Sequence, residues 1–129
     1  ADQGVNVILG EHPHVLQPVD ILVGRDGNET LVAYSLGNFI SGQTGLAKLV
    51  GGILKFDIIK TTIGDEVKIE ISQPQLMPTY NYAENGTVNY QLVPLVESDQ
   101  RDYFETVQAL MENYSNVVDV VDYITYDEN

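Results

Sequence analysis

The fold of this chain is indicated first by two alternating stretches, Leu54-Lys55-Phe56-Asp57-Ile58 and Val67-Lys68-Ile69-Glu70-Ile71. In both stretches apolar side chains alternate with charged ones, which is typical of a β-strand with one buried face and one wet face. The turn residues between them, Ile63-Gly64-Asp65-Glu66, favour a chain reversal. Together these residues predict a β-hairpin near the centre of the chain.

A second hairpin and a buried strand are predicted upstream of this centre. Ile21-Leu22-Val23 and Leu31-Val32-Ala33-Tyr34 flank the Asp-Gly turn of residues 24–28, which favours an antiparallel pair. The run Val5-Asn6-Val7-Ile8-Leu9 is typical of a strand that is covered on both faces. Residues 41–52 hold four glycines and predict a mobile loop, a kind of segment that often borders a site.

Downstream of the central hairpin the sequence period changes from strand to helix. Pro74, Pro78 and Pro94 predict edge strands or loops, because proline cannot donate to a strand ladder. Apolar residues then recur at helical spacing and predict a helix from about Asp99 to Tyr114, with Ser98 or Asp99 as its cap. Residues 117–121 are β-branched but could also form a second short helix, and both alternatives stay open.

These elements predict an α+β fold, with a mostly antiparallel β-sheet and the C-terminal helix packed on one side of it. The 129 residues, 43% of them hydrophobic, suit a single unit over residues 1–129. We divide this unit into a motif-bearing segment 1–40, a β-rich segment 41–97 and a helical C-terminal segment 98–129. Exposed sheet surface is expected to favour a homo-oligomer.

The charge of the chain excludes some partners. Six Lys and Arg residues against 19 Asp and Glu residues give a formal charge of -13. This charge repels nucleic acid, so we expect no nucleic-acid partner. It also repels a free anionic polymer unless metal ions or a basic surface intervene. The absence of cysteine excludes disulfides and thiolate metal sites.

The sequence contains no signal or transmembrane segment. No apolar run is long enough to span a bilayer, and Ala1-Asp2-Gln3-Gly4 lacks the basic and apolar regions of a signal peptide. An apolar strand pattern follows these residues almost at once. We therefore expect a piece of a longer protein rather than a whole cytosolic one.

Both histidines lie in Gly10-Glu11-His12-Pro13-His14, directly after the apolar strand. In an extended backbone, residues i and i+2 point to the same side, so both imidazoles could converge on one metal ion or on two adjacent ions. Pro13 biases His12 toward extended geometry. The alternative is a surface turn with hydrogen-bonded rings, and two imidazoles alone cannot make a catalytic site.

Two blocks of the sequence resemble the last two conserved blocks of a known family. The first block runs from Gly4 to Val19 and contains the His-Pro-His sequence, and the second runs from Leu31 to Ile40. Both resemble the CapA family of poly-gamma-glutamate and bacterial capsule synthesis proteins, which is similar to calcineurin-like metallophosphatases. Beyond Gly52 the resemblance fades. It implies that the chain is the C-terminal portion of a calcineurin-like, metallophosphatase-type layered sandwich.

The resemblance also implies a partial metal site. His12 and His14 match the histidine motif of the family and become candidate ligands for divalent transition metals, namely Mn, Fe or Zn, in the intact protein. Glu11 departs from the family pattern and is either an oxygen ligand or, as we favour, a surface carboxylate. Gln17, Ser35 and Asn38 lie in the matching blocks, where they could orient ligands or substrate, or simply satisfy turn hydrogen bonds.

The function that the resemblance implies belongs to a longer parent protein at the bacterial cell surface, or membrane-associated outside the cell. In one hypothesis this parent is a metal-dependent, phosphoesterase-like hydrolase or transferase of capsule synthesis, and the present chain alone binds no metal tightly and is inactive. In the alternative it is a non-catalytic polymer-handling or assembly module. The implied partners are the N-terminal part of the same protein, membrane subunits of a capsule synthase and an anionic polymer. A plain structural β-rich domain is the third interpretation.

Overall fold

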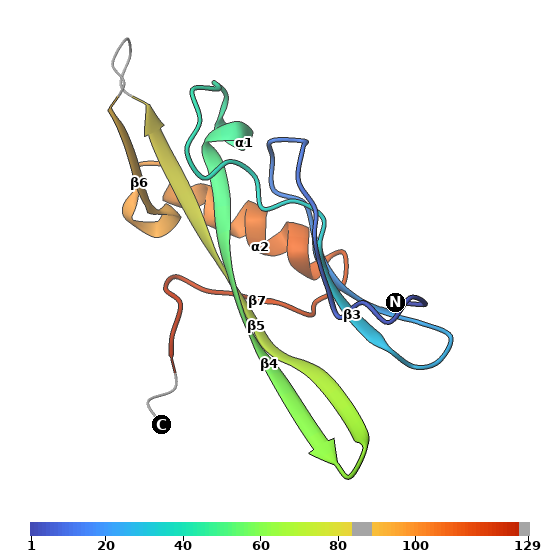
Figure 1. Cartoon of the computed structure of the whole chain (residues 1–129). Helices are drawn as coiled ribbons and strands as arrows, with labels where there is room; N and C mark the ends of the chain where they lie inside the picture. Colours follow the sequence, from blue (N-terminus) through green and yellow to red (C-terminus); the bar gives the residue numbers. More distant parts are fainter. Residues whose placement is uncertain (84–88, 127–129) are drawn as a thin grey trace.

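The computed structural model describes residues 1–83 and 89–126, in which the strands form two sheets (Figure 1). The first sheet has three strands in the order β1-β3-β2. The second has four strands, with β5 between β4 and β6 and with β7 also paired to β5. The strands are β1 (Val7–Leu9), β2 (Val19–Val23), β3 (Glu29–Ala33), β4 (Val50–Ile63), β5 (Glu66–Ala83), β6 (Tyr90–Pro94) and β7 (Asp119–Val120).

The expected antiparallel pairing holds for three of the five strand pairs, but there are two sheets and each also contains a parallel pair, so both are mixed. Strand β3 pairs with β2 in the antiparallel sense but with β1 in the parallel sense. Strand β5 pairs antiparallel with β4 and β6 and parallel with β7. The expected combination of sheet and C-terminal helix is confirmed, and both predicted hairpins, β2–β3 and β4–β5, are present.

The helices differ from those that the sequence predicts, because one was not expected and the other is shorter. Helix α1 (Leu46–Leu49) lies inside the segment expected to be a loop, and helix α2 (Phe104–Glu112) replaces the helix expected from Asp99 to Tyr114. Two 3-10 turns, Leu95–Glu97 and Arg101–Tyr103, precede α2. The tail after α2 contains β7, so the strand alternative holds for residues 119 and 120, while residues 127–129 of the predicted C-terminal segment lie outside the described residues.

Tyrosines of β5 hold the start of the C-terminal segment. The Tyr82 hydroxyl accepts a hydrogen bond from the Asp99 main-chain N–H at 3.0 Å and donates to Asp99 Oδ1 at 3.2 Å. Tyr80 stacks edge-on against Tyr82 with ring centroids 4.8 Å apart. Burial, followed by the nearby Asp99 and Tyr82, raises the pKa of the Tyr80 phenol above its usual value, so this phenol stays neutral and acts as a packing group.

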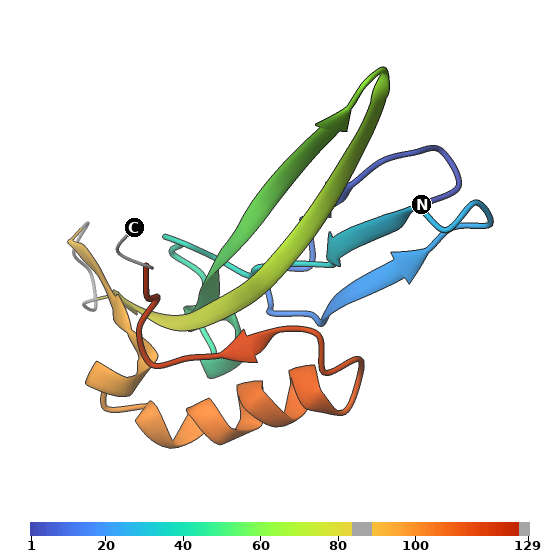
Figure 2. The same ribbon diagram turned by 90° about the horizontal axis from the view of Figure 1, so that it is seen from below.

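The hydrophobic core lies where the two sheets meet α2. Figure 2 shows α2 running along one side of the strands, with the far end of the β4–β5 hairpin projecting away from the body. The buried core residues come from both sheets, from α2 and from the segments beside it: Val19, Leu31, Ala33, Val50, Leu76, Leu95, Val107, Met111 and Val118. The core therefore contains residues of the motif-bearing segment as well as residues from the rest of the chain.

The projecting end of the β4–β5 hairpin leaves its apolar side chains uncovered by the described residues. Ile58 is 62% exposed and Ile63 is 75% exposed. The alternation that predicted this hairpin is therefore real, but the apolar face is buried only near the body. No helix in the described part of the chain is long and apolar enough to cross a membrane.

Candidate functional site

The two sequence blocks that carry the candidate residues meet at one edge of the first sheet. Strands β1 and β3 are parallel, with Val7 opposite Leu31 and Leu9 opposite Ala33. Their carboxyl ends therefore lie side by side, and the loop with His12 and His14 leaves from the same edge as the loop with Ser35 and Asn38. Open sheets with parallel strands commonly place their sites at this edge.

His14 and Asn38 are in direct contact across these two loops. The His14 Nδ1 atom lies 2.7 Å from Asn38 Oδ1, which is a short hydrogen bond. The Asn38 amide nitrogen lies 3.4 Å from the main-chain oxygen of His14. Asn38 is thus the predicted orienting residue that the fold brings against a predicted ligand.

The local backbone of the His-Pro-His sequence differs from the expectation. His12 has a φ of 111° and His14 a φ of 60°, so neither residue is extended, and His12 departs from the geometry that Pro13 favours for it. The argument that i and i+2 face the same side therefore does not apply here. A positive φ in a residue other than glycine is uncommon and tends to occur at functional sites. The backbone of this bend therefore also marks it as a candidate site.

The remaining candidates differ in their placement. Glu11 and His12 are exposed. Ser35 is buried, and its hydroxyl accepts a hydrogen bond from the Gly37 N–H at 3.2 Å, which satisfies a tight turn. Gln17 donates its main-chain N–H to the Ser35 carbonyl at 2.9 Å. Ser35 and the Gln17 backbone therefore shape the Asn38 loop.

Several residues that support Asn38 were not predicted from the sequence. The Asn38 amide nitrogen also donates to the Lys48 carbonyl at 3.0 Å and to Gln43 Oε1 at 3.3 Å. Below this loop, the buried Asn81 of β5 donates its amide to the Ser41 carbonyl at 2.8 Å. The glycine-rich character of residues 41–52 was the available signal, since it marked a loop of the kind that borders a site.

A glycine of β4 allows the Asn38 loop to lie flat on the second sheet. Gly51 forms a bridge with Gly37, and a β-carbon at Gly51 would overlap the main-chain oxygen of Asn38. Since backbone atoms cannot swing aside as a side chain can, the loop must move if residue 51 acquires a side chain. Gly51 therefore sets the position of Asn38 and, through it, that of His14.

We expect Gly51→Ala to lower the free energy of unfolding by about 1–3 kcal/mol, the usual range for overpacking a well-packed site. Urea denaturation followed by far-UV circular dichroism measures this change. Gly42→Ala is the matched control, because a β-carbon there meets only the Tyr90 hydroxyl, the far end of a side chain, at 2.9 Å. If both variants unfold at the same urea concentration, Gly51 does not lie as close to the Asn38 main-chain oxygen as the structure indicates.

The described residues do not by themselves form a metal site. Sites for Mn, Fe or Zn need several imidazole and carboxylate ligands around the ion. Residues 1–83 and 89–126 contain no group of three or more His, Asp or Glu side chains placed to hold an ion. His14 suits the role of one ligand, because metal-binding histidines are typically held through their other ring nitrogen, as His14 is through Nδ1. The donor set within this part of the chain is therefore incomplete.

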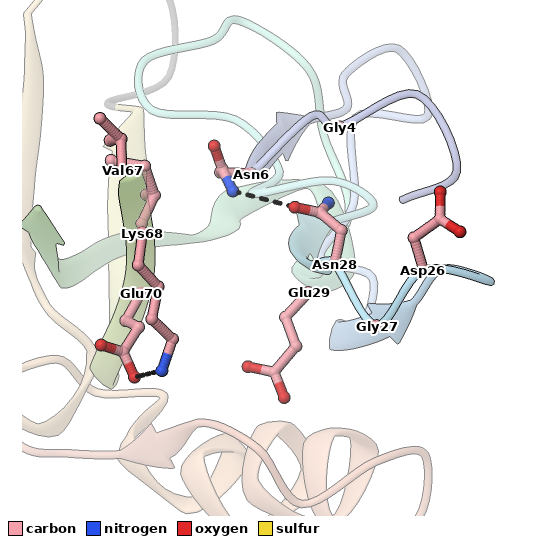
Figure 3. Close-up of a pocket in the computed structure, with 10 residues that line it drawn as sticks. Gly4, Asn6, Asp26, Gly27, Asn28, Glu29, Val67, Lys68 and Glu70 are labelled. Carbon is pink, nitrogen blue, oxygen red and sulfur yellow. Dashed lines mark hydrogen bonds and ion pairs between the residues drawn. The ribbon is translucent and has the colours of Figure 1, made fainter. Parts of the chain in front are cut away.

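A large cleft lies elsewhere on the molecule. It has a volume of about 590 Å³ and lies between the β2–β3 turn, the residues before β1 and the hairpin strand β5 (Figure 3). Its lining includes Asn6 and Asn28, whose side chains are 3.4 Å apart, and the ion pair of Lys68 with Glu70 at 2.7 Å. Because Asn6 and Asn28 precede β1 and β3, this cleft is at the opposite sheet edge from His14. This cleft is thus separate from the candidate site at His14 and Asn38.

Comparisons with known proteins agree with the two sequence blocks. Residues 1–43 match the family model described as bacterial capsule synthesis protein PGA_cap. The chain is 33% identical over 64 residues to the PGA biosynthesis protein CapA of Bacillus subtilis (strain 168), a match that covers 50% of this chain and 16% of that protein. It is 29% identical over 93 residues to the capsule biosynthesis protein CapA of Bacillus anthracis, covering 70% of this chain and 21% of that protein. No solved structure matches the chain.

Residues 1–43 include His12, His14, Ser35 and Asn38, so the similarity to the bacterial capsule synthesis family covers the candidate site. More particularly, the chain is similar to CapA capsule synthesis proteins over part of its length. The predicted resemblance to the CapA family is confirmed over this part of the chain. The chain spans 16% and 21% of the length of the two relatives, so the activity of a whole protein is a matter for proposal.

Proposed function

We propose that this chain contributes a histidine limb to a metal site in a capsule synthesis protein built on a calcineurin-like metallophosphatase sandwich. His14 and His12 are the ligands of this limb, and carboxylate and amide ligands come from another part of the same protein. The single observation that carries the proposal is the 2.7 Å contact of His14 Nδ1 with Asn38 Oδ1. Metal-binding histidines are typically held in this way through the second ring nitrogen.

The chemistry proposed for the complete site is that of a metal-dependent hydrolase or transferase acting on a phosphoester. Bound Mn, Fe or Zn ions would supply Lewis acidity and an activated water. The histidines would contribute neutral nitrogen ligands, which suit these ions. The present chain alone, with its incomplete donor set, is then inactive.

The proposed setting is the bacterial cell envelope, in keeping with the capsule-related names of the two relatives. Membrane subunits of a capsule synthase and an anionic polymer are the proposed partners. The formal charge of -13 on this chain opposes direct contact with such a polymer. Metal ions, or a basic surface on another part of the protein, would have to offset this repulsion.

A second candidate function is a non-catalytic module that handles the polymer or assembles the synthase. The observation that favours it is the lack of a third metal-ligating side chain near the histidines within residues 1–83 and 89–126. The two functions differ in the ligands expected upstream. Intact Asp and Asn ligand blocks in the longer protein support the metal site, and degenerate blocks support the scaffold.

We expect the intact protein to bind Mn, Fe or Zn and to lose at least tenfold in metal affinity in the His14→Ala variant, because loss of a ligand should cost no less than loss of the residue that orients it. Metal content after dialysis and titration calorimetry measure this loss. Asn116→Ala is the control, because Asn116 is also exposed and has a positive φ of 49°, so it reproduces the backbone effect without removing an imidazole. An intact protein without bound metal, or with equal affinity in the two variants, would contradict the metal site.

A further inference from the structure

We propose that Asn38 is a positioning residue that fixes the proton of neutral His14 on Nδ1 and leaves Nε2 as the nitrogen with a free lone pair. The use of that lone pair for a metal rests on the function proposed above. The location of the proton does not, since it follows from the hydrogen bonds of Asn38 alone.

The orientation of the Asn38 amide is determined by its main-chain neighbours. One end of the amide lies 3.0 Å from the Lys48 carbonyl oxygen and 3.4 Å from the His14 carbonyl oxygen. Carbonyl oxygens only accept hydrogen bonds, so the group facing both of them must be the NH₂ group. The other end, which faces the His14 ring, is therefore the amide oxygen.

An amide oxygen opposite the ring decides the tautomer. Oδ1 of Asn38 is an acceptor without a proton, and it lies 2.7 Å from His14 Nδ1. The contact is a hydrogen bond only if Nδ1 carries the proton and donates it. In a neutral imidazole the other nitrogen is then the acceptor, so Nε2 presents the lone pair.

The Asn38 side chain is held firmly enough to impose this choice. The residue is only 8% exposed, and its amide has three acceptors within 3.4 Å. The main chain of the loop lies in close contact with Gly51 at Asn38, and the Ser41 carbonyl of the same loop accepts a hydrogen bond from buried Asn81. A rigid acceptor opposite a ring is the arrangement by which proteins select a histidine tautomer.

Asn38 also holds the backbone of His14. It contacts both the ring and the main-chain oxygen of this residue, which has a left-handed φ of 60°. Such a conformation persists where the surroundings determine it. One asparagine thus supports the unusual backbone and the ring of the same histidine.

The tautomer can be measured directly in the 129-residue chain, which has only two histidines. In long-range ¹H–¹⁵N correlation spectra of histidine-labelled protein at about pH 8.5, where imidazoles are neutral, the two ring nitrogens show which one is protonated. We expect His14 to be in the Nδ1–H form. In Asn38→Leu, loss of a hydrogen bond should change the ratio of the two tautomers by about 3- to 10-fold away from this form.

Two further variants distinguish a positioning role of Asn38 toward His14 from a general effect on the structure. In Asn38→Asp one carboxylate oxygen can still accept from Nδ1, so the Nδ1–H form of His14 should be restored, whereas the other oxygen meets the Lys48 carbonyl and lowers the free energy of unfolding. Asn113→Leu makes the same change of side chain in the exposed cap of α2 and should leave the His14 spectrum unchanged. A native His14 in the Nε2–H form, or an Asn38→Leu spectrum equal to that of the native chain, overturns the inference.

Different experimental results would contradict the role of Asn38 and the proposed metal site. Nδ1–H protonation of His14 in the chain, combined with an intact protein that takes up no Mn, Fe or Zn, contradicts the metal site and supports the role of Asn38. Metal uptake that depends on His14, combined with an Nε2–H ring, contradicts the role of Asn38 and supports the metal site.

Discussion

Replacement of Leu76 by alanine is expected to lower the free energy of unfolding by about 2–5 kcal/mol, the usual cost of removing a buried leucine side chain. Leu76 is 0% exposed and lies in the central strand β5, opposite Leu54 of β4 and Val120 of β7. Its side chain also covers Gly52, where a β-carbon would come within 2.7 Å of Leu76 Cδ1. Neighbours on several sides leave little room for the site to collapse around a smaller side chain, which places the expected cost in the upper part of this range.

Urea unfolding followed by circular dichroism tests this value, with Leu110→Ala as the matched control. Leu110 is on α2, is 38% exposed and should lose no more than about 1 kcal/mol for the same chemical change. Should Leu76→Ala leave too little folded protein, Leu76→Met keeps the volume and should cost less than about 1.5 kcal/mol. Equal losses for Leu76→Ala and Leu110→Ala would show that β5 is not the centre of the core.

The elements that could be predicted from the sequence are those that depend on neighbours in the chain. The β4–β5 hairpin follows from the alternation on either side of Gly64, whose φ of 61° is the left-handed conformation that glycine adopts at low cost. The β2–β3 hairpin follows in the same way from its Asp-Gly turn. In both cases a short turn determines the register, so no distant contact is needed.

The proline rule failed for the central strand because of distant pairing. Pro74 and Pro78 both lie within β5, although proline favours edges. Pro74 lies where the register with β4 shifts between Lys55 and Asp57, which is a bulge. Pro78 lies between the part of β5 that pairs with β6 and the part that pairs with β7. Both prolines thus occupy interruptions of the ladder, and these depend on strands far away in the sequence.

The length of α2 was overestimated because its candidate caps have other partners. The Ser98 hydroxyl donates to the Leu95 carbonyl at 2.7 Å and accepts from the Gln100 N–H at 3.0 Å, and Asp99 Oδ1 accepts from the Tyr82 hydroxyl at 3.2 Å. These groups therefore shape a 3-10 segment, and the regular helix begins only at Phe104. Tyr82 is 17 residues from Asp99, so helical periodicity alone could not reveal this competition.

The candidate site, too, could be predicted from the sequence only in part. The sequence marked His14 and Asn38 separately, but their contact spans 24 residues and depends on the parallel pairing of β1 with β3. It also depends on Asn81, which lies 40 residues from Ser41 and holds the loop from below. The residue types were predictable from motifs, whereas the hydrogen bonds between them are a product of the fold.

Asn81→Asp is expected to cost about 4 kcal/mol of unfolding free energy at pH 7. Asn81 is 0% exposed, its Nδ2 atom donates to the Ser41 carbonyl at 2.8 Å, and its Oδ1 atom has no hydrogen-bond partner among the described residues. A carboxylate would therefore place negative oxygens against a carbonyl oxygen and in a buried position without a donor. Such burial raises the pKa of an Asp by several units, and keeping the group protonated at pH 7 from an ordinary value of about 3.9 costs about 4 kcal/mol.

The pH dependence of this cost identifies its cause. The pKa of the new carboxyl group is higher in the folded chain than in the unfolded chain, so its penalty is largest at high pH and disappears as the pH falls below about 4. In the protonated form its O–H can again donate to Ser41, as the amide did. The difference in unfolding free energy between Asn81→Asp and the native chain, measured at each pH from 4.5 to 8, should therefore grow with pH at up to about 1.4 kcal/mol per unit.

Asn116→Asp provides the control for this prediction, because Asn116 is exposed and should change the stability by no more than about 0.5 kcal/mol at any of these pH values. Asn81→Leu separates the charge from the hydrogen bond, since it removes the donor to Ser41 but adds no titrating group. Its cost should be independent of pH. A pH-independent cost for Asn81→Asp as well would mean that residue 81 reaches solvent, and the loop that carries Asn38 would then lack its buried anchor.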